Sequence, residues 1–214
     1  MRLVLPRLYV ILDAALINSP ERDCAASLAE AGVRLLQYRN KSVQARQYLE
    51  SCRELAEMLC SREVTFFVND RPDVAFLAGA SGVHVGQEDL AVEQARGVVG
   101  QNKLVGISTH NLEQFKQAAA SSADYIAVGP VYGTSTKANP GPVVGLEFLR
   151  QVRQLTDKPV VAIGGITLGR AAAVIEAGAD SAAVISGILS ATDPAERARQ
   201  YIDTLGAAKR AAAV

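Results

Sequence analysis

Short, continuously apolar runs alternate along this chain with longer segments in which apolar residues recur at helical spacing. The starts of the apolar runs lie roughly 25 residues apart, which is the length of one strand followed by one helix. The runs are continuous because parallel strands between a barrel core and a layer of helices are buried on both faces. We therefore predict eight parallel strands, at Leu8–Leu12, Leu35–Tyr38, Val64–Val68, Gly82–Val85, Leu104–Ile107, Tyr125–Val128, Val160–Ile163 and Ala182–Ile185.

Helix boundaries are marked between these runs. Ser19 is a candidate N-cap with Pro20 in the first turn of the helix that follows. Asn111 is a candidate N-cap for the helix that runs through Gln114 and Ala118. Gly145 begins a segment with apolar residues at helical spacing. Glycine lies at three helix exits and suits a left-handed C-cap there: Ala31-Gly32-Val33, Ala80-Ser81-Gly82 and Ala177-Gly178-Ala179-Asp180.

Eight strand–helix units in 214 residues predict an α/β protein, a (β/α)8 TIM barrel in which residues 1–214 form one domain. The main alternative is an open, doubly wound sheet. Residues 207–214 are expected to form a frayed C-terminal tail.

Composition and charge narrow the classes of function. Lys and Arg number 22, as do Asp and Glu, so we expect neither nucleic acid nor a membrane surface as a partner. The absence of Trp and the 5% aromatic content argue against a platform for stacking bases. Any affinity for anions must therefore be local, and small-molecule ligands are the expected partners.

The expected location is cytoplasmic. Pro6 and Arg7 interrupt the N-terminal apolar run, so a signal peptide is not expected, and no apolar stretch is long enough to span a membrane. Cys24, Cys52 and Cys60 form an odd, widely spaced set that is typical of reduced thiols. The sequence leaves the oligomeric state open, a homo-oligomer included.

Polar residues directly follow the predicted strands, where (β/α)8 enzymes hold their active sites. Cations, two acids, hydroxyls and glycine turns would converge on one rim and form a site for phosphate and a metal ion. The set comprises Gln37, Arg39 and Lys41; Asn69, Asp70 and Arg71; Gly86, Gln87, Glu88 and Asp89; Ser108, Thr109 and His110; the loop Gly129–Lys137; Gly164 and Gly165; and Ser186 and Gly187.

Gln37, Arg39 and Lys41 occupy alternate positions, so they would share one face of an extended strand end. Arginine can hold two phosphate oxygens in a fork, and lysine acts as a mobile point charge. A solvated strand end is the alternative interpretation.

Asp70 and Asp89 end neighbouring strands and could share one divalent cation. Magnesium is commonly held by one or two carboxylates together with phosphate oxygens of a substrate. The alternative is that each aspartate caps the helix that follows it.

Glycine-rich turns follow the last two strands, at Gly164-Gly165 and Ser186-Gly187. These are the loops from which barrels often build a phosphate site with backbone N–H groups, although glycine in a plain tight turn is the alternative. The loop Gly129–Lys137 combines glycine, hydroxyls and one cation, which indicates a lid over an anionic ligand.

Only two histidines are present. His84 lies within a predicted strand and is expected to be a buried, hydrogen-bonded residue, and His110 lies on the rim. Neither is assigned a catalytic role, and zinc is not expected because no His/Cys ligand spacing is present.

Taken together, these motifs resemble the thiamine-phosphate synthase family over most of the chain. The resemblance rests on Gln37-Tyr38-Arg39-Asn40-Lys41, Asn69-Asp70, Gly86-Gln87-Glu88-Asp89-Leu90, Gly106-Ile107-Ser108, Thr134-Ser135-Thr136-Lys137, Ile163-Gly164-Gly165-Ile166 and Val184-Ile185-Ser186. Gly133 departs from the pattern, since many members carry proline there.

The resemblance implies a (β/α)8 barrel and a transferase that joins 4-amino-5-hydroxymethyl-2-methylpyrimidine diphosphate to a thiazole phosphate, with magnesium as cofactor and pyrophosphate released.

The resemblance also implies roles for individual residues. Gln37, Arg39, Lys41, Asn69, Ser108 and Lys137 would hold the pyrimidine diphosphate. Thr134, Thr136, Gly165, Ile185 and Ser186 would hold the thiazole phosphate. Asp70 and Asp89 would hold magnesium, and Arg39, Lys41, Ser108 and Lys137 would take part in catalysis.

Three rival functions remain. A thiazole tautomerase of similar fold has little use for this set of cations and acids, and a non-catalytic barrel that binds thiamine precursors would tolerate loss of the two carboxylates. A Schiff-base aldolase is disfavoured because Lys137 lies on a polar loop rather than in the apolar pocket that would lower its pKa.

Overall fold

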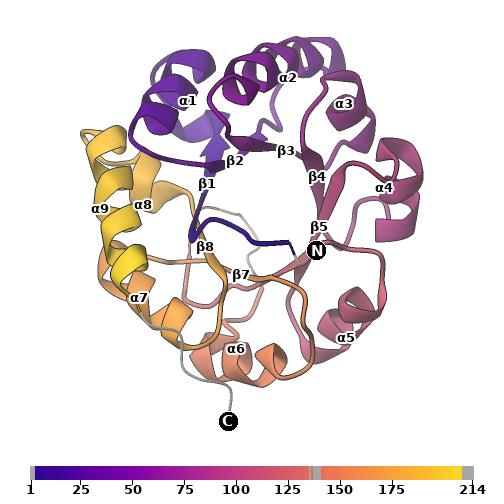
Figure 1. Cartoon of the computed structure of the whole chain (residues 1–214), viewed down its shortest axis with the longest axis vertical. Coiled ribbons are helices and arrows are strands. Elements are labelled where there is room, and N and C mark those ends of the chain that lie inside the picture. The colour runs from indigo at the N-terminus through magenta and orange to yellow at the C-terminus, as the bar shows by residue number, and fades with distance from the viewer. Residues whose placement is uncertain (1–2, 135, 137–140, 209–214) are drawn as a thin grey trace.

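The computed structural model describes residues 3–134, 136 and 141–208, and within this part the strands close into a parallel barrel. Figure 1 shows the ring of strands with the helices outside it. Strands are hydrogen-bonded in chain order, and β8 closes the ring against β1. The strands are β1 (Leu8–Asp13), β2 (Leu35–Arg39), β3 (Thr65–Asn69), β4 (Gly82–Val85), β5 (Leu104–Thr109), β6 (Tyr125–Val128), β7 (Val160–Ile163) and β8 (Ser181–Val184). The prediction of a (β/α)8 barrel is confirmed.

A helix follows each strand and covers the outer face of the barrel (Figure 1). The helices are η1 (Ala14–Leu16), α1 (Glu21–Glu30), α2 (Ala45–Cys60), α3 (Pro72–Leu77), α4 (Val92–Val99), α5 (Leu112–Ala120), α6 (Gly145–Arg153), α7 (Leu168–Glu176), α8 (Ser186–Leu189) and α9 (Pro194–Ala207).

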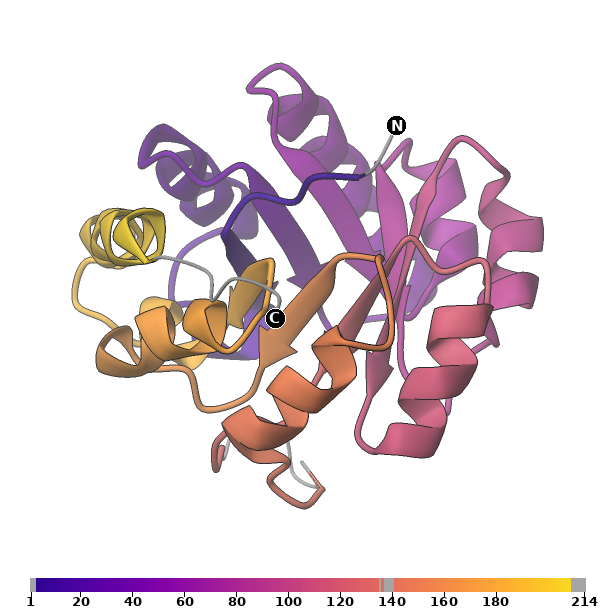
Figure 2. The same cartoon turned by 60° about the horizontal axis from the view of Figure 1, so that its bottom comes forward.

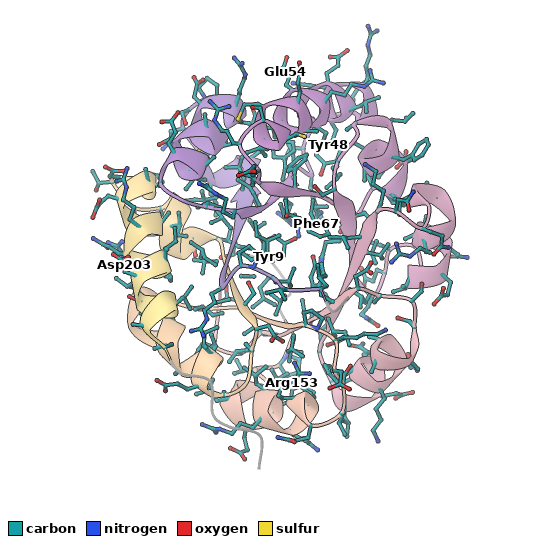
Figure 3. All side chains as sticks on the ribbon, in the orientation of Figure 1. Tyr9, Tyr48, Glu54, Phe67, Arg153 and Asp203 are labelled. Carbon is teal, nitrogen blue, oxygen red and sulfur yellow. The ribbon has the colours of Figure 1, made fainter. Side chains whose placement is uncertain are left out.

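Two apolar clusters hold the barrel together. The larger lies between the outward faces of the strands and the helices, and the smaller fills the barrel interior with residues that include Tyr9, Phe67 and Tyr125. Tyr9 and Phe67 lie inside the ring of strands in Figure 3. The segment before β1 places Leu5 against this inner cluster, at the end of the barrel opposite the loop between β6 and α6 (Figure 2). That end is therefore plugged, and ligands must enter at the carboxyl ends of the strands.

Several strand ends differ from the prediction because ladder pairing continues beyond the apolar run. Asp13 pairs with Arg39 as the last residues of β1 and β2, and β3 likewise ends at the polar Asn69. The last strand is shifted the other way: β8 begins at Ser181 and ends at Val184, one residue earlier than predicted, so Ile185 lies just outside it.

The helix caps were predicted with mixed success. Asn111 caps α5 by accepting a hydrogen bond from the Gln114 N–H at 2.9 Å. The prediction for Ser19 is wrong, because Pro20 occupies the N-cap of α1 and no side chain caps it. Gly32 and Gly178 have the expected positive φ, but Gly82 lies inside β4.

The exit of α3 uses a different glycine from the predicted one. Gly79, with φ of 72°, takes the left-handed conformation there. Gly82 is needed for space instead, since a Cβ would overlap the carbonyl oxygen of Leu104 on β5 and lie 2.7 Å from the Phe67 ring.

The C-terminal segment is partly described. Ala207 ends α9, and Ala208 is buried with its carbonyl accepting a hydrogen bond from Arg7. The rest of the predicted tail, residues 209–214, lies outside the described residues. None of the helices in the described part of the chain has the length and apolar character needed to cross a bilayer.

Candidate active site

Charged side chains gather at the carboxyl ends of β1 to β4. Asp13 is buried at the end of β1 and forms an ion pair with Arg39 at the end of β2. Asp13 also accepts a hydrogen bond from the Ala15 N–H at 3.1 Å. Because Asp13 and Arg39 are direct partners in the strand register, the backbone itself holds this pair together.

A second group of charges continues the rim. The Lys41 ammonium lies 3.0 Å from the Asp70 carboxylate and remains more than half exposed. Asp70 has a positive φ of 62°, an uncommon conformation for a residue other than glycine. We call Asp13, Arg39, Lys41, Asp70 and Asp89 the charged half of the mouth.

The carboxyls of Asp70 and Asp89 lie side by side, close enough for one to hydrogen-bond to the other when it carries a proton. Burial raises the pKa of Asp89, and the neighbouring Asp70 raises it further. Burial also opposes ionisation of Asp70, but the Asp89 hydrogen bond and the Lys41 ammonium outweigh it and lower the Asp70 pKa. Two adjacent carboxyls that resist double ionisation form a place where a cation is favoured.

The loop after β4 is fixed to its neighbours. Asp89 accepts a hydrogen bond from the Gly86 N–H at 2.7 Å, so it bridges its own loop and does not cap α4, whose N-cap is Ala91. Gln87 donates from its side-chain amide to the carbonyl of Ser108 at 2.6 Å. Ser108, on β5, therefore connects the charged half to the other side of the mouth.

A cavity of about 320 Å³ opens at the carboxyl ends of β5 to β8. Its wall combines hydroxyls, glycine backbone and aliphatic side chains, and it includes no carboxylate among the described residues. We call its lining the cavity half of the mouth: Ser108, His110, Gly129, Pro130, Gly133, Thr134, Thr136, Ile163, Gly164, Gly165, Ile166, Thr167, Arg170, Ala183, Val184, Ile185, Ser186 and Gly187.

Hydroxyls on two loops meet at the entrance of this cavity. The Thr136 hydroxyl lies 3.3 Å from that of Ser186, and Thr134 lies 3.3 Å from Thr136. The loop between β6 and α6 thus contacts the first residue of α8. Ser135, Lys137 and residues 138–140 lie outside the described residues, so the position of the predicted catalytic lysine is not part of this geometry.

Glycine at the turn after β7 is required by space and conformation. Gly165 has φ of 62°, and a Cβ there would overlap the carbonyl oxygen of Gly133 and lie 2.9 Å from the Tyr132 Cβ. A Cβ on Gly164, with φ of 99°, would lie 2.5 Å from the Pro130 Cβ. Both positions keep the backbone of β7 in close contact with the loop after β6.

The structure divides the predicted site residues between the two halves. Arg39, Lys41, Asp70 and Asp89 lie in the charged half, and the half-buried Asn69 ends β3 beside Asp70. Ser108, Thr134, Thr136, Gly165, Ile185 and Ser186 line the cavity.

Gln37 lies deeper in the barrel than either half. Its amide donates to the Tyr9 hydroxyl at 2.8 Å and is 2% exposed. The expectation for His84 is confirmed, since it is buried and hydrogen-bonded to Tyr125 and Ser108, each at 2.8 Å.

Two charged residues of the mouth were missed from the sequence. Asp13 follows the first apolar run just as the predicted site residues follow later runs, so the same strand-end rule would have found it. Arg170 lies in the first turn of α7 rather than at the end of β7, and no strand-end rule points to it. It donates to the Gly165 carbonyl at 3.1 Å and stacks over the Tyr132 ring, 4.7 Å from the centroid.

Comparisons with known proteins identify the family of this chain. The family model described as thiamine monophosphate synthase matches residues 8–188. The thiamine-phosphate synthase of Koribacter versatilis (strain Ellin345) is 51% identical over 209 residues, which cover 95% of this chain and 97% of that protein. The thiamine-phosphate synthase of Chloroflexus aurantiacus (strain ATCC 29366 / DSM 635 / J-10-fl) is 44% identical over 195 residues, 91% and 90% of the two chains.

A solved structure gives the same result. Thiamine phosphate pyrophosphorylase from Pyrococcus furiosus superposes with a TM-score of 0.86 at 34% identity, covering 94% of this chain and 96% of that one. The fold and these relatives together define a (β/α)8-barrel transferase. The chain belongs to the thiamine monophosphate synthase family, and its function is thiamine-phosphate synthesis.

Proposed function

We propose that this enzyme joins 4-amino-5-hydroxymethyl-2-methylpyrimidine diphosphate to a thiazole phosphate and releases pyrophosphate. One observation carries the proposal: the mouth places a charged half beside a cavity lined by hydroxyls and glycine, with Ser108 between them. Two phosphate-bearing substrates that meet end to end need two such regions and a shared boundary.

The charged half suits the diphosphate. Arg39 and Lys41 offer positive charge, and Gln37, Asn69 and Ser108 are the uncharged residues that the family resemblance assigns to the same substrate. Lys137 belongs to this set by resemblance alone, because it lies outside the described residues.

The cavity suits the thiazole phosphate. Thr134, Thr136 and Ser186 bring hydroxyls together at its entrance. Gly165 and Ile185 contribute backbone and an aliphatic wall. A volume of about 320 Å³ is at the lower end of the range for small-molecule sites, which fits a single small heterocycle with a phosphate.

Asp70 and Asp89 fit a magnesium ion. In the described part of the chain no group of three or more Asp, Glu, His or Cys side chains is arranged to hold a metal ion, so further ligands would be water and diphosphate oxygens. That arrangement is the usual one for magnesium, whereas zinc requires more protein ligands. The raised pKa of Asp89 beside Asp70 is a further sign that this pair favours a cation.

The reaction then needs positioning rather than a nucleophilic side chain. The bond between the pyrimidine methylene and the diphosphate oxygen breaks, and its electron pair leaves with pyrophosphate. The electron-rich aminopyrimidine supports the cationic methylene, and the thiazole nitrogen donates its lone pair to form the new C–N bond.

The two cations of the charged half, Arg39 and Lys41, stabilise the negative charge that develops on the leaving group, and Asp13 holds Arg39 in place. A bound magnesium ion would add Lewis-acid stabilisation of the same oxygens. The cavity half holds the thiazole phosphate against the methylene and excludes water from it.

The test is a coupled assay of pyrophosphate release from the purified protein. Release should require both substrates and should fall when magnesium is removed with a chelator and return when it is restored. No release beyond that of a heat-treated sample would contradict the synthase proposal. Release that is insensitive to chelation would contradict the magnesium assignment alone.

A further inference from the structure

A continuous chain of hydrogen bonds crosses the barrel interior. It joins Gln37 to Tyr9 at 2.8 Å, Tyr9 to Tyr125 at 3.0 Å, Tyr125 to His84 Nδ1 at 2.8 Å, and His84 Nε2 to Ser108 Oγ at 2.8 Å. The five residues come from β2, β1, β6, β4 and β5, and each is at most 7% exposed. Gln37 and Ser108, two predicted substrate-binding residues, are thus connected through three residues to which no role was assigned.

The barrel interior is shaped around this chain. Tyr125 stacks on His84, with ring centroids 5.5 Å apart, and meets Phe67 edge to face at 5.4 Å. Gly106 leaves room for the Tyr125 ring, because a Cβ there would overlap it. Gly82 leaves similar room for Phe67. Tyr125 therefore has a fixed position rather than one of several rotamers.

Proton counting gives the chain a direction. The Gln37 amide nitrogen can only donate, so the Tyr9 oxygen accepts and the Tyr9 proton is left for Tyr125. The Tyr125 proton then goes to His84 Nδ1, and His84 donates from Nε2 to Ser108. Burial raises the pKa of both tyrosines, so both hydroxyls keep the proton that this count requires.

We propose that this chain runs in one direction, from Gln37 to Ser108, and fixes Ser108 as a hydrogen-bond donor toward the bound ligand. Tyr9, Tyr125 and His84 are positioning residues. Because the Ser108 oxygen accepts from His84, its own proton is directed into the mouth, where Ser108 lines the cavity. Ser108 then selects a ligand that presents an acceptor atom at this place. If the amide of Gln37 faced the other way, the whole chain would reverse and Ser108 would donate to His84 instead.

The inference rests on the proposed function only in taking the ligand to be the pyrimidine diphosphate. The direction of the hydrogen-bond chain can be measured without any ligand. The chain has two histidines, so the ¹⁵N spectrum of histidine-labelled protein contains two rings, and the His110→Gln variant assigns them. We expect His84 to carry its proton on Nε2 and to have an unprotonated Nδ1. A proton on Nδ1, or on both nitrogens, would overturn the proposal.

Variants then test whether the tyrosines impose this tautomer. Tyr125→Phe removes the donor to Nδ1 but keeps the ring, so the Nδ1–H form of His84 should become populated. Tyr38→Phe is the matched control, because it removes another buried hydroxyl, which donates to Glu21 on α1. It should leave the His84 spectrum unchanged. An unchanged spectrum in Tyr125→Phe would contradict the role of the tyrosines, and the wild-type tautomer decides the direction even if that variant folds poorly.

A double-mutant cycle measures the functional consequence. Loss of one hydrogen bond should lower kcat/KM about tenfold in Tyr125→Phe. In the Ser108→Ala background the same change should have less than about a twofold effect, because its consequence passes through Ser108. Equal effects in the two backgrounds would show that Tyr125 acts by packing alone. If the wild-type protein released no pyrophosphate, the proposed function would be contradicted. The tautomer of His84 would still test the direction of the hydrogen-bond chain, because that measurement needs no substrate.

Discussion

The two halves of the mouth solve the problem of phosphate recognition in different ways. In the charged half two ion pairs form, Arg39 with Asp13 and Lys41 with Asp70, and the Asp89 carboxyl lies beside that of Asp70. In the cavity half, hydroxyls and glycine turns take the place of ion pairs. Under the proposed function, the charged half meets the phosphates that gain negative charge as they leave, and the cavity half meets a phosphate whose charge does not change.

The two halves differ because fixed charges and neutral hydrogen-bond donors act on different steps of the reaction. Preorganised charges stabilise a transition state when the charge on the substrate grows during the reaction. Neutral donors hold a constant charge equally in the ground and transition states, so they serve binding and orientation. Changes in the charged half should therefore act mainly on kcat, and changes in the cavity half mainly on KM.

The largest expected effect is that of Asp89→Ala. Removing one of the two carboxylates proposed to hold magnesium should lower kcat by roughly 10²-fold or more, since the ion they hold would stabilise the leaving group. Binding of the thiazole phosphate, measured by calorimetry, should change little. Asp89→Asn can still accept the Gly86 N–H and should show the same loss of rate, which separates charge from folding.

Asp73→Ala provides the control for this experiment. Asp73 is an exposed carboxylate on α3 that pairs with Arg71, and it lies outside the predicted site. It should leave both kcat and thiazole phosphate binding within about twofold. Comparable losses of rate and of thiazole phosphate binding in Asp89→Ala would break the proposed division of the mouth.

The next effect is expected at Asp13. Asp13→Leu leaves Arg39 without its buried partner, so kcat/KM should fall by roughly 10-fold and the free energy of unfolding by on the order of 3 kcal/mol. Denaturant unfolding and the pyrophosphate assay give the two quantities. The double variant Asp13→Leu/Arg39→Met should regain much of the stability but none of the activity. Recovered activity would mean that Arg39 is not used in the reaction.

Much of this architecture was predictable from the sequence. The eight strands are visible because each is buried on both faces, and the strand-end rule brought Arg39, Asp70, Asp89 and Ser108 to one mouth. The bounds were less accurate at Asp13 and Asn69, because the ladder continues into polar residues that the apolar pattern does not mark.

The contacts between side chains were not predictable in the same way. The chain from Gln37 to Ser108 joins five strands, and its order depends on how deep each side chain lies within the closed barrel. Apolar periodicity reports which face a residue occupies but not its depth. Arg170 was missed for a related reason, since it reaches the mouth from α7 by folding back over Tyr132.

In the cavity half, Gly165→Ala tests the close contact between the loops after β6 and β7. The positive φ alone should cost about 1–2 kcal/mol, and the added Cβ would push against Gly133 and Tyr132. The KM for the thiazole phosphate should rise about fivefold, with a smaller change in kcat, because the hydroxyls of that loop are displaced. Gly169→Ala is the matched control, since a Cβ there meets no other atom within 4 Å. A kcat effect larger than the KM effect would contradict the assignment of this half to binding.

The smallest expected effect concerns the charge of the cavity half itself. Arg170 is the one arginine or lysine among the described lining residues, and it is exposed at the entrance. Arg170→Gln should raise the KM for the thiazole phosphate about threefold at low ionic strength, and the difference should shrink as salt screens the charge. Arg199→Gln, which removes an exposed cation on α9, should show no such dependence. A large, salt-insensitive loss in Arg170→Gln would mean that this half also relies on a fixed charge, and the contrast between the two halves would then be one of degree.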